Sequence, residues 1–389
     1  MNSFVYDIPT KVYFGPNQLD KLGEEISKYG KKVFFIHGRH IYDNGIYDAV
    51  MKTARDYDLT ITEFMKVKPN PRHTDVQEGV DLCRANGCDV ILAVGGGSAI
   101  DSSKVIASGV YIDAPVWDVI IGKYPVTRSL PIVTICTVAA TGSEMNIGGV
   151  ISNLETRDKQ SLRRPTQRPK VTFLNPEYTY SVGQYQTACG TMDILCHTLE
   201  SYFSSDDCMY LMDTFMEGIV STVFKYGPIA FNDPDNYEAR ANLMWAAPWA
   251  INELTRADKP QSWTIHPIEH ELSAFYDITH GLGLSILMPR YFRHILDEKS
   301  LIRFKNLAVR AFGFDASLSN EEAAEKVIQE IENLAFNTFG LTSNLTDLGI
   351  DDSNFEVMAG KVANENGYYT TGYRKLSKED IVEILKACL

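Results

Sequence analysis

The sequence lacks the features that mark secreted, membrane-spanning and nucleic-acid-binding proteins. It has seven cysteines, an odd number, and no C-x-x-C pair, so we expect reduced thiols. No apolar run reaches the roughly 18 residues of a membrane span, and no signal peptide is evident at the N-terminus. A formal net charge of −13 argues against a general nucleic-acid or anionic-membrane surface. We therefore expect a cytoplasmic protein with neither nucleic-acid nor membrane partners.

The first half of the chain alternates short apolar runs with amphipathic ones. Apolar and β-branched runs predict strands, and runs with helical spacing predict helices. The expected strands are Lys32–His37, Leu59–Phe64, Val90–Val94, Pro131–Thr137 and Val171–Leu174, and the expected helices are Ile46–Tyr57, Thr74–Asn86 and Ala99–Ser108. This alternation predicts an α/β domain with a Rossmann-like, parallel sheet, on which ligands bind at the C-terminal ends of the strands.

The second half of the chain predicts helices only. They are expected at Tyr185–Phe203, Asp206–Tyr226, Asp235–Leu254, Ile265–Tyr276, Gly283–His294, Asn320–Phe339, Asp352–Ala363 and Lys378–Cys388. We therefore predict two domains, an α/β domain over residues 1–182 and an all-α domain over residues 183–389. The interface between two such domains is a favoured place for ligands.

A glycine-rich turn follows the third expected strand. Gly95–Ser98 reads Gly-Gly-Gly-Ser and opens a helix. Glycines let backbone N–H groups approach an anion, and the helix directs its positive end toward that anion. The turn matches neither common nucleotide-binding fingerprint, so a merely tight β–α turn is the alternative. Asp101 and Lys104, farther along this helix, have the spacing of a solvated ion pair.

The end of the first expected strand bears on the choice of cofactor. NAD sites place an acidic residue there to bind the ribose hydroxyls. This chain instead has Gly38, Arg39 and His40, with no acid. An arginine can bind a phosphate through two parallel hydrogen bonds. The turn therefore favours NADP, unless Arg39 is an ordinary surface arginine.

Four residues of the helical half form a candidate metal site. Asp193 and His197 are four residues apart, which places both side chains on one face of a helix. His266 follows in the helix expected at Ile265–Tyr276, and His280 follows in the segment before the next expected helix. One carboxylate and three imidazoles suit Fe(II) or Zn(II) and are poor ligands for Mg(II) or Ca(II). Taken alone, an Asp–His pair at this spacing is more commonly a surface or capping pair.

A rival motif overlaps this set. Residues 266–270 read His-Pro-Ile-Glu-His, which matches the H-x-x-E-H signature of zinc peptidases. In that case His266 and His270 would bind the metal and Glu269 would be the base. A peptidase would leave the Gly95–Ser98 turn and the Asp193–His197 pair without a role.

Several segments resemble the iron-containing, or group III, alcohol dehydrogenases, and within them the branch of NADP-dependent butanol dehydrogenases and broad-range aldehyde reductases. The resemblance runs nearly end to end and is carried by Tyr13–Gly15, Asn44–Gly45, Lys68–Pro71, Gly95–Asp101, Thr141–Asn146, Gly190–His197, Ala239–Asn242, His266–Ser273, Thr279–Gly283 and Leu376–Leu385. It implies a dehydroquinate synthase-like two-domain fold and a homodimer. It also implies hydride transfer between NADP(H) and a small aldehyde or primary alcohol, with Fe(II) or Zn(II). The remaining alternatives are polyol or hydroxyacid dehydrogenases, synthases that use the nicotinamide transiently, and a non-catalytic metal-stabilised binding protein.

The resemblance also assigns roles to residues of this chain. It implies that Asp193, His197, His266 and His280 bind the metal, and that His270 stands beside it, near the nicotinamide and the substrate oxygen. An imidazole that titrates near pH 7 is suited to proton exchange, so we expect His270 to be the catalytic residue. The expected dinucleotide contacts are Gly38, Arg39, His40, Asn70, Gly95, Gly96, Gly97, Ser98, Asp101, Thr137, Thr141 and Lys159. Arg39 and His40 depart from the small residues that the NADP-preferring branch has at these positions.

Overall fold

The chain folds into an α/β unit and a helical unit, as the sequence predicts. A computed structural model describes residues 3–204, 209–255, 263–363, 367–369 and 373–389. The α/β unit spans Asp7–Val182, and the helical unit spans Gly183–Leu389 together with the N-terminal stretch up to Tyr6. Among the described helices, none is both long and apolar enough to cross a membrane.

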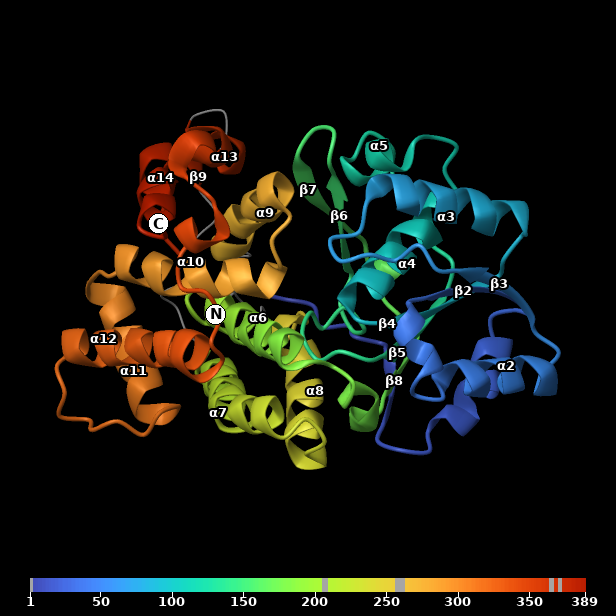
Figure 1. Ribbon diagram of the computed structural model, residues 1–389, viewed down its shortest axis with the longest axis horizontal. Helices are drawn as coiled ribbons and strands as arrows, with labels where there is room; N and C mark the ends of the chain where they lie inside the picture. The colour runs from blue at the N-terminus through green and yellow to red at the C-terminus, as the bar shows by residue number, and fades with distance from the viewer. Residues whose placement is uncertain (1–2, 205–208, 256–262, 364–366, 370–372) are drawn as a thin grey trace. The chain divides into compact units, whose positions relative to one another are not determined.

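A six-stranded parallel sheet forms the centre of the α/β unit (Figure 1). Its strands are β1 (Lys11–Phe14), β2 (Lys32–His37), β3 (Thr60–Phe64), β4 (Val90–Gly95), β5 (Ile132–Cys136) and β8 (Val171–Leu174). They lie in the order β1-β8-β5-β4-β2-β3. His37 pairs with Val94, and Gly95 pairs with Cys136. The C-terminal ends of β2, β4 and β5 therefore meet at one edge of the sheet.

Helices cover both faces of this sheet because successive strand residues point to opposite sides. Val33 and Phe35 share one hydrophobic cluster with residues of α1 (Leu22–Ser27) and α2 (Ile46–Asp56). Phe34 points the other way, with its ring 5.6 Å from that of Phe64. The helices of that second face are α3 (His73–Ala85) and α4 (Gly97–Gly109), with the short α5 (Val116–Ile120) beside them (Figure 1).

An antiparallel hairpin, which the sequence did not predict, packs against α4. It consists of β6 (Gly148–Asn153) and β7 (Asp158–Arg163). The strand β7 reads Asp-Lys-Gln-Ser-Leu-Arg, a polar run without the apolar signal of a buried strand. A Cβ at Gly149 would lie only 2.7 Å from the backbone oxygen of Asp101. Glycine at this position therefore lets the hairpin approach the helix.

The helical unit is organised around α6 (Gln184–Tyr202), which is buried from Thr187 to Tyr202. The other described helices are α7 (Tyr210–Asn232), α8 (Tyr237–Ile251), α9 (Ile265–Tyr276), α10 (His280–His294), α11 (Glu298–Arg310), α12 (Asn320–Glu332), α13 (Phe355–Val362) and α14 (Lys378–Lys386), with a two-residue ladder of β9 (Tyr368–Tyr369) and β10 (Leu376–Ser377). Helices α7, α8 and α10 pack on α6 (Figure 1). The central position of α6 explains why it is buried on all sides.

The predicted helices differ from the observed ones in a few places. The predicted start at Asp206 lies outside the described residues, and α7 is described from Tyr210. Helix α10 begins at His280, three residues earlier than predicted. Helix α11 was not predicted, although the Asp297 carboxylate caps it by accepting from the Ser300 N–H at 2.8 Å.

Candidate functional site

Helix α6 presents Asp193 and His197 on one buried face. Both residues are nearly inaccessible to solvent. Helix α10 approaches α6 closely at Gly281. A Cβ at this position would lie 2.2 Å from the backbone oxygen of Cys189. Only glycine fits in this space, and the neighbouring residue in the chain is His280. The Thr-His-Gly segment thus brings a second helix, α10, to the Asp193 carboxylate.

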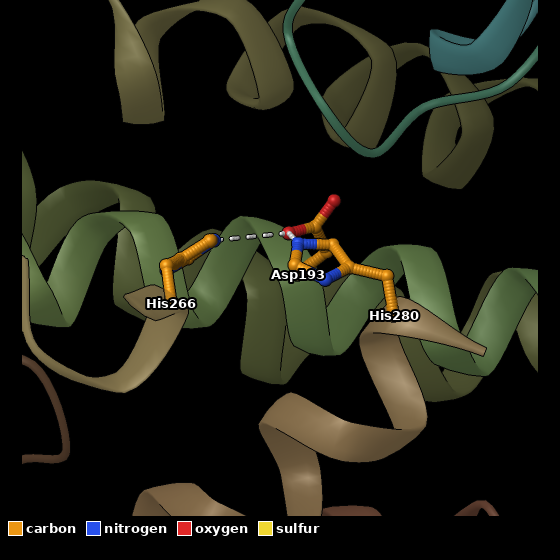
Figure 2. Close-up of side chains that lie close together, drawn as sticks. All are labelled: Asp193, His266 and His280. Carbon is orange, nitrogen blue, oxygen red and sulfur yellow. Dashed lines mark ion pairs between the residues drawn. The ribbon is translucent and has the colours of Figure 1, made fainter. Parts of the chain in front are cut away.

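Three imidazoles converge on one oxygen of Asp193. The distances from the Oδ1 atom to the Nε2 atoms are 3.3 Å for His197, 3.7 Å for His266 and 3.8 Å for His280. Figure 2 shows His266, from α9, and His280, from α10, reaching toward Asp193. Two ligands at about 2.1 Å from one tetrahedral metal ion lie about 3.4 Å apart. These three distances from Asp193 Oδ1 are therefore those expected around a single metal ion.

The donor atoms of this cluster also have the chemistry of a metal site. In the described part of the chain, Asp193 Oδ1 and His266 Nε2 are buried and make no hydrogen bond. Buried polar atoms without a partner are costly, and a divalent cation would satisfy both at once. Asp193, His266 and His280 form a triad whose ligand atoms all lie within 4.8 Å of one another. The residues present thus fit Fe(II) or Zn(II).

Electrostatics within the cluster favour the charged forms. Burial would raise the pKa of Asp193, but the neighbouring His197, His266 and His280 outweigh it and lower the pKa to about 2. Burial would lower the pKa of His266, but the nearby carboxylates of Glu200 and Asp193 raise it to about 9, so a metal ion bound at Nε2 would displace a proton. Asp193 is therefore an anion at neutral pH and ready to hold a cation.

His270 lies beside this cluster. Its ring centroid is 5.7 Å from that of His280 and 6.4 Å from that of His266. The side chain is half-buried, whereas Glu269, the residue before it, is fully buried. The Glu269 carboxylate contacts His280 Nδ1 and accepts from the Ser273 hydroxyl. Glu269 is therefore not placed as a water-activating base, and the peptidase alternative is not supported.

Two further residues contact the histidines and were not singled out from the sequence. The ring of Trp263 lies 4.4 Å from that of His266 and 5.0 Å from that of His197. Glu200 contacts His266 Nδ1. Its position seven residues after Asp193 places it on the same face of α6, so the helical period could have identified it. No spacing rule points to Trp263.

The glycine turn of the α/β unit has the shape expected of an anion-binding loop. It follows β4, and α4 starts at Gly97. Gly95 has a φ of 151°, which L side chains rarely adopt. A Cβ at Gly97 would lie 2.5 Å from the Thr141 side chain. The Thr137 N–H donates to the Gly95 carbonyl at 3.0 Å. Thr137 and Thr141 therefore lie beside the half-exposed turn that includes Gly96 and Ser98.

Asp101 and Lys104 do not form the solvated pair that their spacing suggests. Lys104 is fully buried and donates to the Ser143 hydroxyl, the Asn146 side-chain oxygen and the Gly148 carbonyl, each at 2.8 Å. Burial lowers its pKa to about 7. The Asp101 carboxylate accepts from the Ser143 hydroxyl and from the Val150 N–H. The solvated-pair interpretation is wrong, because the hairpin and the preceding loop cover this face of α4.

The other expected dinucleotide residues lie at two places in the α/β unit. The strand β2 is followed by Gly38, Arg39 and His40. The side chains of Arg39 and His40 are exposed. Asn70 has a left-handed φ of 48°. The loop of Asn70 reaches the hairpin, where the Ser152 N–H donates to the Pro71 carbonyl at 2.8 Å and Ser152 pairs with Lys159. The hairpin thus joins the Asn70 loop to the buried Lys159.

Comparison with known proteins relates this geometry to one enzyme family. Residues 9–176 match the model of the family described as iron-containing alcohol dehydrogenase, and residues 187–389 match that of its C-terminal part. The chain is 45% identical over 387 residues to NADH-dependent butanol dehydrogenase A of Clostridium acetobutylicum, covering 99% of each protein. It is 32% identical to the NADPH-dependent aldehyde reductase YqhD of Escherichia coli, covering 96% of this chain and 95% of that protein.

Solved structures give the same picture. The crystal structure of NADH-dependent butanol dehydrogenase A from Thermotoga maritima matches with a TM-score of 0.93 and 34% sequence identity. The match covers 100% of this chain and 99% of the other.

Proposed function

The chain belongs to the iron-containing alcohol dehydrogenase family and is an alcohol dehydrogenase or aldehyde reductase, and we propose that its substrates are short primary alcohols and their aldehydes, such as butanol and butanal. The observation that carries this proposal is the convergence of three imidazoles on the buried Asp193 oxygen. The names of the relatives from Clostridium acetobutylicum and Thermotoga maritima support the size of the substrate.

We propose that Asp193, His197, His266 and His280 hold one Fe(II) or Zn(II) ion. When bound, the metal supplies Lewis acidity at the substrate oxygen and the nicotinamide supplies the hydride. The remaining task of the protein is to move a proton to or from that oxygen. His270 lies beside the metal-binding histidines and is half-buried, so an imidazole is available for this exchange.

We propose that the dinucleotide binds the α/β unit with its pyrophosphate at Gly95–Ser98. The half-exposed turn, the close contact of Gly97 with Thr141 and the start of α4 support this placement. Thr137 and Thr141 border the turn, and Asn70 and Lys159 are joined through the hairpin. The exposed Arg39 after β2 favours NADP(H).

NAD(H) is the second candidate because a specific observation favours it. The relative that is 45% identical is named as NADH-dependent. A carboxylate also stands near the end of β2, since Glu63 Oε2 lies 3.5 Å from His37 Nε2. A carboxylate at such a place would disfavour an additional phosphate. The preference for NADP(H) or NAD(H) therefore depends on whether attraction of the additional phosphate by Arg39 exceeds its repulsion by Glu63.

We further propose that the protein acts in the cytoplasm as a homodimer. Six cysteines of the described residues are free thiols, which suits a reducing compartment. The dimer rests on the resemblance to the family alone.

Oxidation of NADPH and of NADH in the presence of butanal tests this proposal. The protein is stripped of metal and then given Fe(II), Zn(II) or neither. We expect turnover only with metal, and faster turnover with NADPH. An Arg39→Ala variant should lose the advantage of NADPH while keeping the rate with NADH. Faster turnover of the wild type with NADH would overturn the NADP preference, and metal-independent turnover would overturn the proposed metal centre.

A further inference from the structure

Two buried glutamates stand behind two of the histidines. Glu200 of α6 contacts His266, and Glu269 of α9 contacts His280. In both pairs a carboxylate oxygen meets the Nδ1 atom of the imidazole, whereas the Nε2 atom is the one that faces Asp193. Glu269 is fully buried and Glu200 is 4% exposed. Each histidine is thus held between a glutamate on one side and the Asp193 carboxylate on the other.

This arrangement has a specific chemical effect on an imidazole. A neutral histidine carries one proton, and a carboxylate at Nδ1 keeps that proton on Nδ1 as a hydrogen-bond donor. The lone pair of Nε2 then points at the metal, and the ring is fixed in orientation. We propose that Glu200 and Glu269 are positioning residues that set the tautomer and direction of His266 and His280 for one divalent metal ion. This inference rests on the metal centre of the proposed function.

Glu200 is itself held by the start of α9. Its carboxylate accepts hydrogen bonds from the backbone N–H groups of Thr264, Ile265 and His266. The same carboxylate therefore occupies the N-terminus of the helix that carries His266, where a negative charge is favoured. Glu200 thus fixes the position of His266 relative to α6 through both the backbone of α9 and the imidazole of His266.

The packing around Glu269 is equally specific. The Ser273 hydroxyl, one turn farther along α9, donates to Glu269 Oε1. A Cβ at Gly283 would lie 2.8 Å from Glu269 Cγ and 3.1 Å from its Oε1. Glycine three residues after His280 therefore leaves the space that the glutamate fills. The H-x-x-E-H segment acquires a role different from that in peptidases, because its glutamate supports a ligand of another helix.

The charges of the site agree with this assignment. Asp193, Glu200 and Glu269 place three carboxylates in a region almost closed to solvent. Burial of uncompensated charge is costly, and a divalent cation would offset much of it. A pair of glutamates with only a packing role would be replaceable by apolar residues, but two that orient ligands should control the affinity for the metal.

Binding of Co(II) to the metal-free protein tests the inference, with chelator competition for affinity and the visible absorption of Co(II) for ligand geometry. Glu269→Ala should weaken binding by about 10–100-fold and change the spectrum. Glu269→Gln should fall between that variant and the wild type, because its amide oxygen still accepts from Nδ1. Glu271→Gln is the matched control: Glu271 lies in the same helix, is 6% exposed and pairs with Lys361 at 3.8 Å. It should bind Co(II) like the wild type.

The outcomes distinguish failure of the proposed metal centre from failure of the positioning role of the glutamates. No Co(II) bound by the wild type would refute the metal centre itself. Tight binding by the wild type and by both Glu269 variants, with unchanged spectra, would leave the centre intact and overturn the positioning role. If Glu269→Ala fails to fold, the Glu269→Gln and Glu200→Gln spectra decide in the same way, since both keep an oxygen at the position of the carboxylate.

Discussion

The two units of the protein build their candidate sites in different ways. The α/β unit offers backbone at Gly95–Ser98, where Cβ atoms on the three glycines would lie 2.5 to 3.1 Å from neighbouring side chains. The helical unit offers side chains from three helices, and these are buried around Asp193. A site built from backbone depends on residues without a Cβ atom. A site built from side chains depends on neighbouring residues that hold those side chains in position. The two sites should therefore fail separately when residues are changed.

The largest effect is expected from Asp193→Ala in the helical unit. The variant removes the one oxygen that all three imidazoles face. Metal content should fall to the background, and turnover with butanal should drop by about 10³-fold or more. The affinity for NADPH, measured by fluorescence titration, should stay within about twofold. Retention of stoichiometric metal in this variant would contradict the assigned ligand set.

A smaller effect is expected from His270→Ala. Since His270 stands beside the cluster, the metal should remain bound while kcat falls by about 10²-fold and its dependence on pH flattens. His294→Ala is the matched control, because His294 is a half-buried histidine of α10 that contacts Asp380 at 3.1 Å. An unchanged kcat and pH profile in His270→Ala would remove His270 from the proton exchange.

In the α/β unit, Gly97→Ala should mainly weaken cofactor binding. The added Cβ would lie 2.5 Å from Thr141, so the turn or the threonine must move. We expect KM for NADPH to rise by about tenfold, or about 1.4 kcal/mol, with full metal content. Gly218→Ala in α7 is the control, since a Cβ there meets no atom within 4 Å. An equal KM for both variants would argue against phosphate binding at this turn.

The smallest effect concerns the stability of the α/β unit. Burial would raise the pKa of Glu25, but hydrogen bonds from Lys11, Lys28 and Tyr13 lower it to about 2. Because this pKa lies below the ordinary 4.5, the stabilisation is complete above about pH 4.5 and is lost as the pH falls toward 2. Glu25→Gln should cost about 1 kcal/mol at pH 7, measured by urea unfolding.

The control for this prediction is to repeat the urea unfolding of the wild type and of Glu25→Gln at acidic pH. The difference in unfolding free energy between wild type and Glu25→Gln should shrink as the pH falls below 4.5. A difference that does not change with pH would mean that Glu25 contributes through packing and not through its charge.

The sequence predicted the features of both units that depend on local patterns. Apolar runs identified the sheet strands β2, β3, β4, β5 and β8, and the glycine run marked the turn after β4. The strand order could not be predicted, because it depends on contacts between distant segments. The hairpin β6–β7 escaped notice because its second strand is polar and its first strand packs against a helix instead of joining the sheet.

In the helical unit, functional residues whose role depends on contacts between distant segments could likewise not be predicted. The four candidate ligands could be proposed from residue type and spacing, and they do converge. The supporting residues could not be proposed in the same way, since the role of Glu269 depends on a contact with His280 of another helix. Lys104 was misjudged because its neighbours, Ser143 in a loop and Gly148 at the start of β6, lie some 40 residues farther along the chain.

The most direct test of the whole account is a titration of the metal-free wild type with Fe(II) under anaerobic conditions, in which bound metal and butanal-dependent oxidation of NADPH are measured together. The account predicts that activity rises linearly with occupancy and stops at one metal per chain, while NADPH binds equally well before and after the metal. Activity without metal, or a plateau at a different stoichiometry, would contradict the single site around Asp193.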